Sequence, residues 1–265
     1  MKFYEFKTML MLLSPAKKLL TPEQAYLNPT SNPIFSQKTA ELAMLLKRLD
    51  QQGIARLMKI SNDLATINYQ RFQEFDQDDA KSIRSYPAIF LFRGDVYKSL
   101  GVDQWDKESI DFAQSHLLIL SGLYGLLRPL DQILPYRLEM GTKLANSCGN
   151  DLYAFWKQGV TAELNHQIVS HTNPIILNLA SSEYFSVIDQ SLLKAPLVTI
   201  HFKEQRGNEL KVIGIHAKKA RGAMASYINQ DQIDDIDSVK QFNLLRYQYV
   251  DQQSDRNNLV FVRSV

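Results

Sequence analysis

Short apolar runs recur along the chain and are bounded by turn-forming residues. Residues 10–13 form the first run, which ends at Ser14-Pro15, and residues 86–92, 116–121 and 174–179 repeat the pattern. Runs of this length, rich in branched and aromatic side chains, are typical of strands buried on both faces of a sheet. The pattern therefore predicts several central strands.

Segments with helical periodicity lie between these runs. Residues 35–49 carry leucines at spacings of three and four, and Gly53 is expected to end that helix. Residues 54–75 predict two short helices joined by a turn near Ser61-Asn62-Asp63, one of which is expected to cap the second helix. Residues 151–170 predict a longer amphipathic helix. Strands that alternate with helices indicate an α/β fold.

The last third of the chain has a different pattern. Residues 197–205 and 209–217 flank Arg206-Gly207-Asn208 and predict an antiparallel hairpin, in which His201 and His216 would be diagonal neighbours. Residues 218–230 predict a helix, and residues 247–250 and 259–262 two closing strands. The fold class is therefore α/β (mixed α+β): a single compact domain with a mixed sheet and flanking helices.

Composition narrows the class of protein further. The chain has 265 residues, of which 45% are hydrophobic, and this is enough for one core. No apolar stretch approaches the roughly 18 residues of a membrane span, so we expect a cytoplasmic protein. Cys148 is the single cysteine, and the five histidines show no ligand spacing, so we expect neither a metal site nor a cofactor. Met9 is a plausible start, which makes residues 1–8 an extension and 9–265 the domain.

Charge is nearly balanced but unevenly distributed. The formal net charge is +2, from 30 basic and 28 acidic residues. Between residues 191 and 222, however, seven basic residues stand against two acidic ones, Glu204 and Glu209. This distribution predicts a positive face on a nearly neutral molecule.

The densest polar segment is residues 121–141, SGLYGLLRPLDQILPYRLEMG. It places Arg128, Asp131, Arg137 and Glu139 among glycines and prolines without helical or strand periodicity. Long ordered loops in compact domains usually serve a function, and arginine suits phosphate or carboxylate ligands. Alternatively, the two arginines neutralise the two carboxylates and only fix the loop.

Three further segments lie at predicted strand ends, where ligands bind in α/β sheets. Ser14 and Lys17 follow the first strand, and Asn178, Ser181 and Glu183 follow the strand at 174–179. Ser181 is also explained as a helix cap. The third segment, AKKARG at 217–222, is expected at a strand-to-helix junction, where backbone N–H groups and three cations could converge on an anion: Lys218, Lys219 and Arg221. Alternatively, it is a solvated turn whose cations extend into water.

In this order the segments resemble the YaaA family of bacterial peroxide-stress proteins. The matching stretches cover nearly the whole chain: MLMLLSPAK, LMKISNDLATIN, RGDVYKSL, the 21-residue block, DLYAFW, NLASSEYF and AKKARGAM. The resemblance implies a cytosolic protein made under hydrogen peroxide stress that limits free iron and oxidative damage. It also implies the family's own mixed α/β fold, with a helix-hairpin-helix element at residues 54–75 and a positive cleft that binds double-stranded DNA.

The chain departs from the family pattern at a few positions. Arg93 stands where lysine is common and Ser99 where glycine is common. Leu245 and Arg246 occupy positions where an acidic residue and a glycine are expected. The helix pair also lacks a Gly-hydrophobic-Gly hairpin, so backbone contacts to phosphate are not assured there.

Two functional hypotheses follow. In the first, the protein binds double-stranded DNA without sequence preference, through phosphate contacts from Lys17, Arg93, Arg128, Arg137, Lys218, Lys219 and Arg221. In the second, it is an enzyme acting on a phosphorylated or nucleotide-like small molecule, in a pocket formed by the SPAK, LRPLD/PYRLEMG and AKKARG motifs. The possible polar residues of such a pocket are Ser14, Asp131, Glu139, Asn178, Ser181 and Glu183. An open groove would favour the first hypothesis, and a closed pocket joining the distant motifs would favour the second.

Overall fold

A mixed eight-stranded sheet forms the centre of the protein in a computed structural model that describes residues 7–20, 30–75, 85–169 and 171–264. The strand order is β11-β12-β9-β8-β1-β5-β6, with β10 paired to β9. The bounds of these strands are β1 (Lys7–Leu13), β5 (Leu117–Ser121), β6 (Gly125–Leu127), β8 (His171–Asn178), β9 (Leu197–Arg206), β10 (Glu209–Lys211), β11 (Gln248–Tyr249) and β12 (Asn258–Ser264).

The middle of the sheet is parallel and its margins are antiparallel. Strand β1 pairs in parallel with β5 and β8, and β9 pairs in parallel with β8 and β12. The antiparallel pairs are β5–β6, β9–β10 and β11–β12. Burial explains why some strands are continuously apolar and others are not. Every residue of β5 is buried, whereas buried and partly exposed residues alternate along β9. The predicted mixed α/β domain is therefore confirmed.

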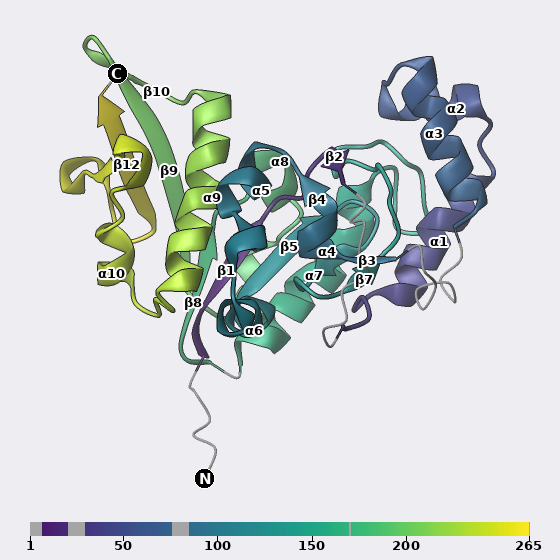
Figure 1. The fold of residues 1–265 in the computed structure, drawn as a ribbon. Coiled ribbons are helices and arrows are strands. Elements are labelled where there is room, and N and C mark those ends of the chain that lie inside the picture. Colours follow the sequence, from purple (N-terminus) through teal and green to yellow (C-terminus); the bar gives the residue numbers. More distant parts are fainter. Residues whose placement is uncertain (1–6, 21–29, 76–84, 170, 265) are drawn as a thin grey trace.

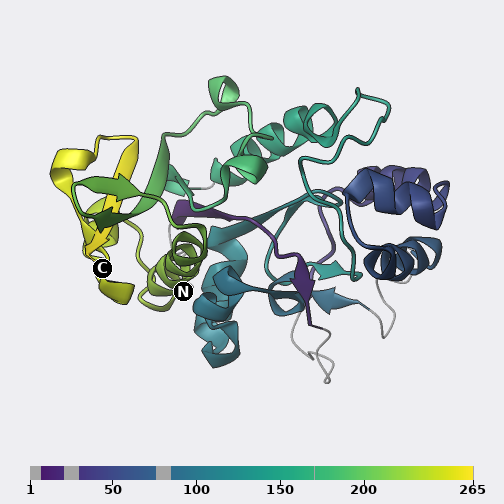
Figure 2. The same cartoon turned by 90° about the horizontal axis from the view of Figure 1, so that it is seen from above.

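Helices cover both faces of the sheet. Figures 1 and 2 show α6 and α9 on one face and α7 on the other, while α1–α3 stand at one end of the molecule and α10 at the opposite end. The helix bounds are α1 (Ser36–Lys47), α2 (Gln51–Met58), α3 (Asn62–Gln73), α4 (Ala88–Leu91), α5 (Asp95–Leu100), α6 (Lys107–His116), α7 (Leu152–Ile168), α8 (Ser182–Phe185), α9 (Gly214–Gln230) and α10 (Ile236–Lys240). In the described ranges, no helix is long and apolar enough to cross a membrane.

Side-chain caps set the starts of several helices. The Asp151 carboxylate accepts a hydrogen bond from the Ala154 N–H at 2.9 Å and begins α7. Ser61, one of the three residues predicted for this role, caps α3. The prediction for Gly53 is wrong: Asp50 accepts from the Gly53 N–H at 2.6 Å, so this glycine lies in the first turn of α2. The helix pair is confirmed, while its helix-hairpin-helix character stays a prediction.

Residues 86–92 do not form a central strand. Only β3 (Tyr86–Pro87) and β4 (Phe92–Arg93) are extended, with α4 between them. The backbone N–H groups of Ala88 and Ile89 donate to the carbonyls of Asp131 and Pro129 at 3.0 Å, so the segment bonds to the 121–141 block instead of the main sheet. β3 pairs with β7 (Gln132–Ile133), and β4 with β2 (Lys18–Leu19). The apolar run correctly predicted that these residues are buried. It could not distinguish a strand from a helix, because both can be buried.

The predicted hairpin after residue 197 is shorter than expected. Only Glu209–Lys211 returns along β9, and α9 begins at Gly214. His216 therefore lies on α9, where it contacts the buried Glu204, whereas His201 bonds to Asn258 at 3.0 Å. The prediction that these histidines are strand neighbours is wrong. As for the chain start, residues 1–6 lie outside the described residues, and the assignment of 1–8 as an extension stays a prediction.

Candidate functional site

Three parallel strands end at the same edge of the sheet, and each is followed by one of the polar segments. Ser14 follows β1, Ser121 is the last residue of β5, and Asn178 is the last residue of β8. Because β1 lies between β5 and β8 in parallel register, these ends are adjacent. Crevices at the carboxyl ends of such strands are the usual ligand sites of open α/β sheets.

Hydrogen bonds join the first and third of these segments. The Ser181 N–H donates to Ser14 Oγ at 2.8 Å, and the two hydroxyls lie 3.2 Å apart. The Tyr97 hydroxyl donates to the Ser14 carbonyl at 3.0 Å. Asn178 is buried, and its side-chain oxygen accepts from the Ala180 N–H at 2.9 Å, so this residue shapes the turn.

The 121–141 block is a packed, ordered segment. Ser121 Oγ and the Tyr136 hydroxyl are 2.6 Å apart, and Trp156 donates to the Gly122 carbonyl at 2.9 Å. A methyl group at Gly122 would lie 2.3 Å from the Leu138 carbonyl oxygen, so only glycine permits this close backbone contact. The expectation of an ordered loop with little helix is confirmed.

Within this block, Arg128 and Asp131 form a structural ion pair. The buried Asp131 carboxylate accepts from Arg128 Nη2 at 2.9 Å, from the Arg128 N–H at 2.8 Å and from the Ser31 hydroxyl at 2.6 Å. Burial raises the pKa of Asp131, against these bonds. This pair fixes the loop and lies outside the pockets described below.

The second arginine pair has a different position. Glu139 accepts from Arg137 Nη2 at 3.0 Å, and its other oxygen lies 2.7 Å from Lys17 Nζ. Arg137 Nε is buried and has no hydrogen-bond partner among the described residues. Lys17, Arg137 and Glu139 line a small space between two larger hollows.

The first hollow, which we call the inner pocket, has a volume of about 480 Å³. It opens between the ends of β1 and β8, the start of α5 and one side of α9. Its charged and hydroxyl-bearing lining consists of Ser14, Lys17, Lys18, Arg93, Asp95, Ser181, Ser182, Glu183, Tyr184, Lys218 and Arg221. Burial raises the pKa of the Tyr184 hydroxyl, which therefore stays protonated.

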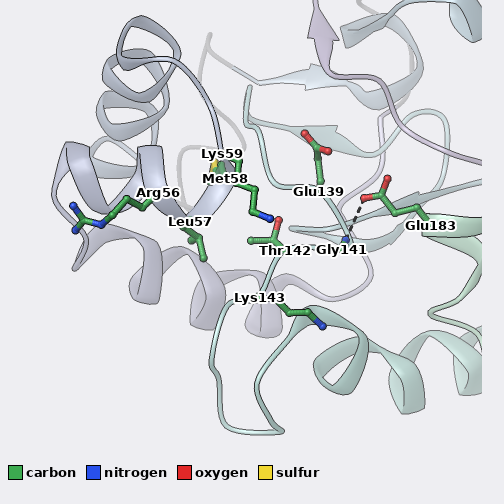
Figure 3. Close-up of a pocket in the computed structure, with 9 residues that line it drawn as sticks. All are labelled: Arg56, Leu57, Met58, Lys59, Glu139, Gly141, Thr142, Lys143 and Glu183. Atoms are coloured by element: carbon green, nitrogen blue, oxygen red, sulfur yellow. Dashed lines mark hydrogen bonds between the residues drawn. The ribbon is translucent and has the colours of Figure 1, made fainter.

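The second hollow, which we call the outer pocket, has a volume of about 470 Å³ and lies between α2 and the 121–141 block (Figure 3). Glu183 lines both pockets and accepts from the Gly141 N–H at 3.2 Å. The remaining charged lining is Arg56, Lys59, Glu139 and Lys143. Glu183 lines both hollows, and Glu139 lines the outer pocket and the small space beside the inner one, so the hollows are neighbours; together we call them the cleft.

The lining of the cleft is more positively charged than the molecule as a whole. Its described lining contains three acidic residues, Asp95, Glu139 and Glu183, and nine basic ones: Lys17, Lys18, Arg56, Lys59, Arg93, Arg137, Lys143, Lys218 and Arg221. The excess of six exceeds the net charge of +2 for the whole chain. Four of the nine form ion pairs: Lys17 and Arg137 with Glu139, Arg93 with Asp103, and Lys143 with Asp151.

Close helix packing presents Lys218 and Arg221 to the inner pocket. Gly222 of α9 lies against α5, where an added Cβ would be 2.0 Å from the Val96 carbonyl oxygen. The expected strand-to-helix junction at 217–222 is wrong, because this segment lies inside α9 and its N–H groups bond within the helix. Side chains alone therefore face the pocket. Lys219 is exposed and lines neither pocket.

Comparison with known proteins places the chain in a family. A family model described as "Peroxide stress protein YaaA" matches residues 9–253. The chain belongs to this family.

Several relatives that match over nearly their whole length support the assignment. A UPF0246 protein of Legionella pneumophila (strain Lens) is 52% identical over 255 residues, which cover 96% of this chain and 99% of that protein. A UPF0246 protein of Caulobacter vibrioides is 44% identical over 256 residues, covering 96% and 99%. One from Crocosphaera subtropica is 41% identical over 255 residues, covering 96% and 100%.

The residues expected from the sequence divide into two groups. The structure gathers Ser14, Lys17, Arg93, Arg137, Glu139, Ser181, Glu183, Lys218 and Arg221 along the cleft of this YaaA-family protein. It leaves out Arg128, Asp131, Asn178 and Lys219. The sequence reasoning missed Arg56, Lys59 and Lys143, because only the tertiary arrangement brings α2 opposite the 121–141 block. Lys18 and Asp95 had a usable signal, since each adjoins a motif already recognised.

Proposed function

We propose that this YaaA-family protein binds double-stranded DNA through the cleft, without reading its sequence, in the cytoplasm of cells under peroxide stress. The observation that supports this proposal best is the excess of basic residues in the two neighbouring hollows that form the cleft. Such a surface attracts the phosphate backbone of DNA irrespective of base sequence.

The cations without an ion pair are the strongest candidates for phosphate contacts. In the described part of the chain these are Lys18, Arg56, Lys59, Lys218 and Arg221. They come from β2, α2 and α9, so they line the cleft from its outer to its inner end. Paired cations are weaker candidates, because Glu139, Asp103 and Asp151 already neutralise them.

The proposed cellular role is to limit oxidative damage, including the damage that free iron causes. This part of the proposal rests on membership of the YaaA family and on the resemblance of the sequence motifs to those of that family. We do not assign an iron site: across the described ranges, no three His, Cys, Asp or Glu side chains gather as metal ligands.

Duplex binding is tested by fluorescence anisotropy with a labelled DNA duplex at several salt concentrations. If all five unpaired cations contact phosphates, the slope of log K against log salt is about −4.5, which corresponds to a roughly 500-fold loss of affinity between 50 and 200 mM salt. The double variant Arg56→Gln with Lys59→Gln should make the slope shallower by about 2.

Lys219→Gln is the matched control. It removes one positive charge from an exposed site on α9 that lies outside both pockets. The wild-type slope should persist in this variant. The proposal would be contradicted if the affinity of the wild type did not depend on salt. It would also be contradicted if the slope became shallower by the same amount in the control and in the double variant.

A further inference from the structure

Arg221 stands in the inner pocket without a counter-charge. Its guanidinium makes no ion pair or hydrogen bond with any described residue, and its Nε atom is buried. Burial lowers the pKa of this arginine, so the folded protein holds its charge at a cost. An anion that enters the pocket would stabilise such a partly buried cation more than it stabilises a cation in open solvent.

The other cations of the inner pocket are placed to share that anion. Lys218 lies three residues before Arg221 on the same side of α9, and it also lacks an ion pair. Arg93 extends from β4, and its ion pair with Asp103 occupies only Nη2, at 3.2 Å. Three cations from two separate elements thus face one pocket, which suits a doubly charged phosphate better than a single carboxylate.

The same pocket also holds hydrogen-bond acceptors. Asp95 is the first residue of α5, and its side chain makes no ion pair among the described residues. Glu183 uses one oxygen, Oε1, to accept from the Gly141 N–H, and its other oxygen makes no hydrogen bond with any described residue. Two carboxylates beside a cationic group do not suit an inorganic anion alone. They suit a ligand whose phosphate is attached to a part that carries hydroxyl groups.

We propose that the inner pocket binds a small phosphate monoester with hydroxyl groups, of the sugar phosphate or mononucleotide class. Arg221, Lys218 and Arg93 hold the phosphate, while Asp95 and Glu183 accept hydrogen bonds from the hydroxyl groups. The volume of about 480 Å³ falls within the range of small-molecule sites. A DNA duplex, with a major groove alone about 12 Å wide, is too large to enter the pocket, so its phosphates would meet Lys18, Lys218 and Arg221 only at the pocket mouth. The ligand is therefore distinct from the proposed DNA partner.

The test is isothermal titration calorimetry of the full chain with ribose 5-phosphate, and with ribose as the unphosphorylated probe. We expect ribose 5-phosphate to bind and ribose not to bind. Arg221→Gln should weaken the binding of ribose 5-phosphate at least about tenfold, and Arg221→Lys should restore part of it. Asp95→Asn should weaken binding of ribose 5-phosphate but leave inorganic phosphate unaffected.

A folding readout separates this role from a structural one. Because Arg221 has no described partner, Arg221→Gln should leave the melting temperature unchanged or raise it. The control Lys219→Gln should bind ribose 5-phosphate as the wild type does. The proposal is overturned if the folded wild type gives no binding heat up to about 10 mM ribose 5-phosphate, a concentration beyond any specific affinity. Equal affinities in the Arg221→Gln and Lys219→Gln variants would also overturn it.

The outcome for DNA binding is independent. Arg56→Gln with Lys59→Gln should retain ribose 5-phosphate affinity, since both residues line the outer pocket only. If the sugar phosphate fails to bind while the DNA salt slope remains steep, only the inner-pocket proposal falls.

Discussion

Replacing Gly222 by alanine should destabilise the protein through the contact between α5 and α9. The added Cβ would lie 2.0 Å from the Val96 carbonyl oxygen and 3.1 Å from the Leu100 nitrogen. Cβ atoms are essentially never found closer than 3.0 Å to another heavy atom, so the helices must separate by about 1 Å. Both partners are backbone atoms, and no side-chain rotation can relieve the clash.

The net effect combines two opposing contributions. Overpacking at a rigid contact costs about 3 kcal/mol, and the higher helix propensity of alanine returns about 1 kcal/mol. The net destabilisation of about 2 kcal/mol lowers the melting temperature by about 4 to 8 °C for a domain of this size. Scanning calorimetry or urea unfolding measures the change.

Gly214→Ala is the matched control, on the same helix. An added Cβ at Gly214 meets nothing within 4 Å, and the residue is the first of α9. This variant should be as stable as the wild type or more stable by up to about 1 kcal/mol. The reasoning is refuted if Gly222→Ala melts within about 1 °C of the wild type, or if both variants lose equal stability.

Two further predictions concern residues outside the cleft. Arg246 has a φ of 65° and is exposed, so Arg246→Gly should relieve left-handed strain and stabilise the protein by about 0.5 to 1 kcal/mol in urea unfolding; unchanged stability would contradict this. Hydrogen bonds from Lys143 and from the Ala154 N–H hold the pKa of Asp151 below its ordinary 3.8. The charged carboxylate therefore stabilises the folded protein above pH 3.8, and this stabilisation is lost as the pH falls through the lowered pKa. Asp151→Asn keeps the cap of α7, and its stability deficit of less than about 1 kcal/mol at pH 7 should shrink as the pH falls below 3.8. A deficit that stays constant with pH would argue against an effect of charge.

The sequence predicted those parts of the fold in which local pattern and burial agree. The runs in β1, β5 and β8 are strands because they are apolar on both faces, and α7 begins where Asp151 can cap it. Residues 86–92 show the limit of this reasoning. A continuous apolar run has no periodicity, and the backbone bonds to Pro129 and Asp131 decide its conformation.

The candidate site was predictable at strand ends but not across the cleft. Ser14 and Ser181 follow parallel strands, and this position is visible in the sequence. The sequence predicts that all three cations of 217–222 converge at a helix start, whereas α9 begins at Gly214, so Lys218 and Arg221 share one side of the helix and Lys219 does not. Arg56 reaches the cleft only through the packing of α2, about which the local sequence contains no information.

The central position of β1 also affects how this chain folds during synthesis. Met11 pairs with Leu117 and Leu12 with Asn178, so the first strand to leave the ribosome gains its neighbours only after much of the chain has been made. At bacterial elongation rates the interval before β8 emerges is on the order of ten seconds. Until β5 emerges, the apolar strand 9–13 has neither of its sheet partners, and until β8 emerges it still lacks one. It is therefore a natural binding segment for chaperones that hold nascent chains.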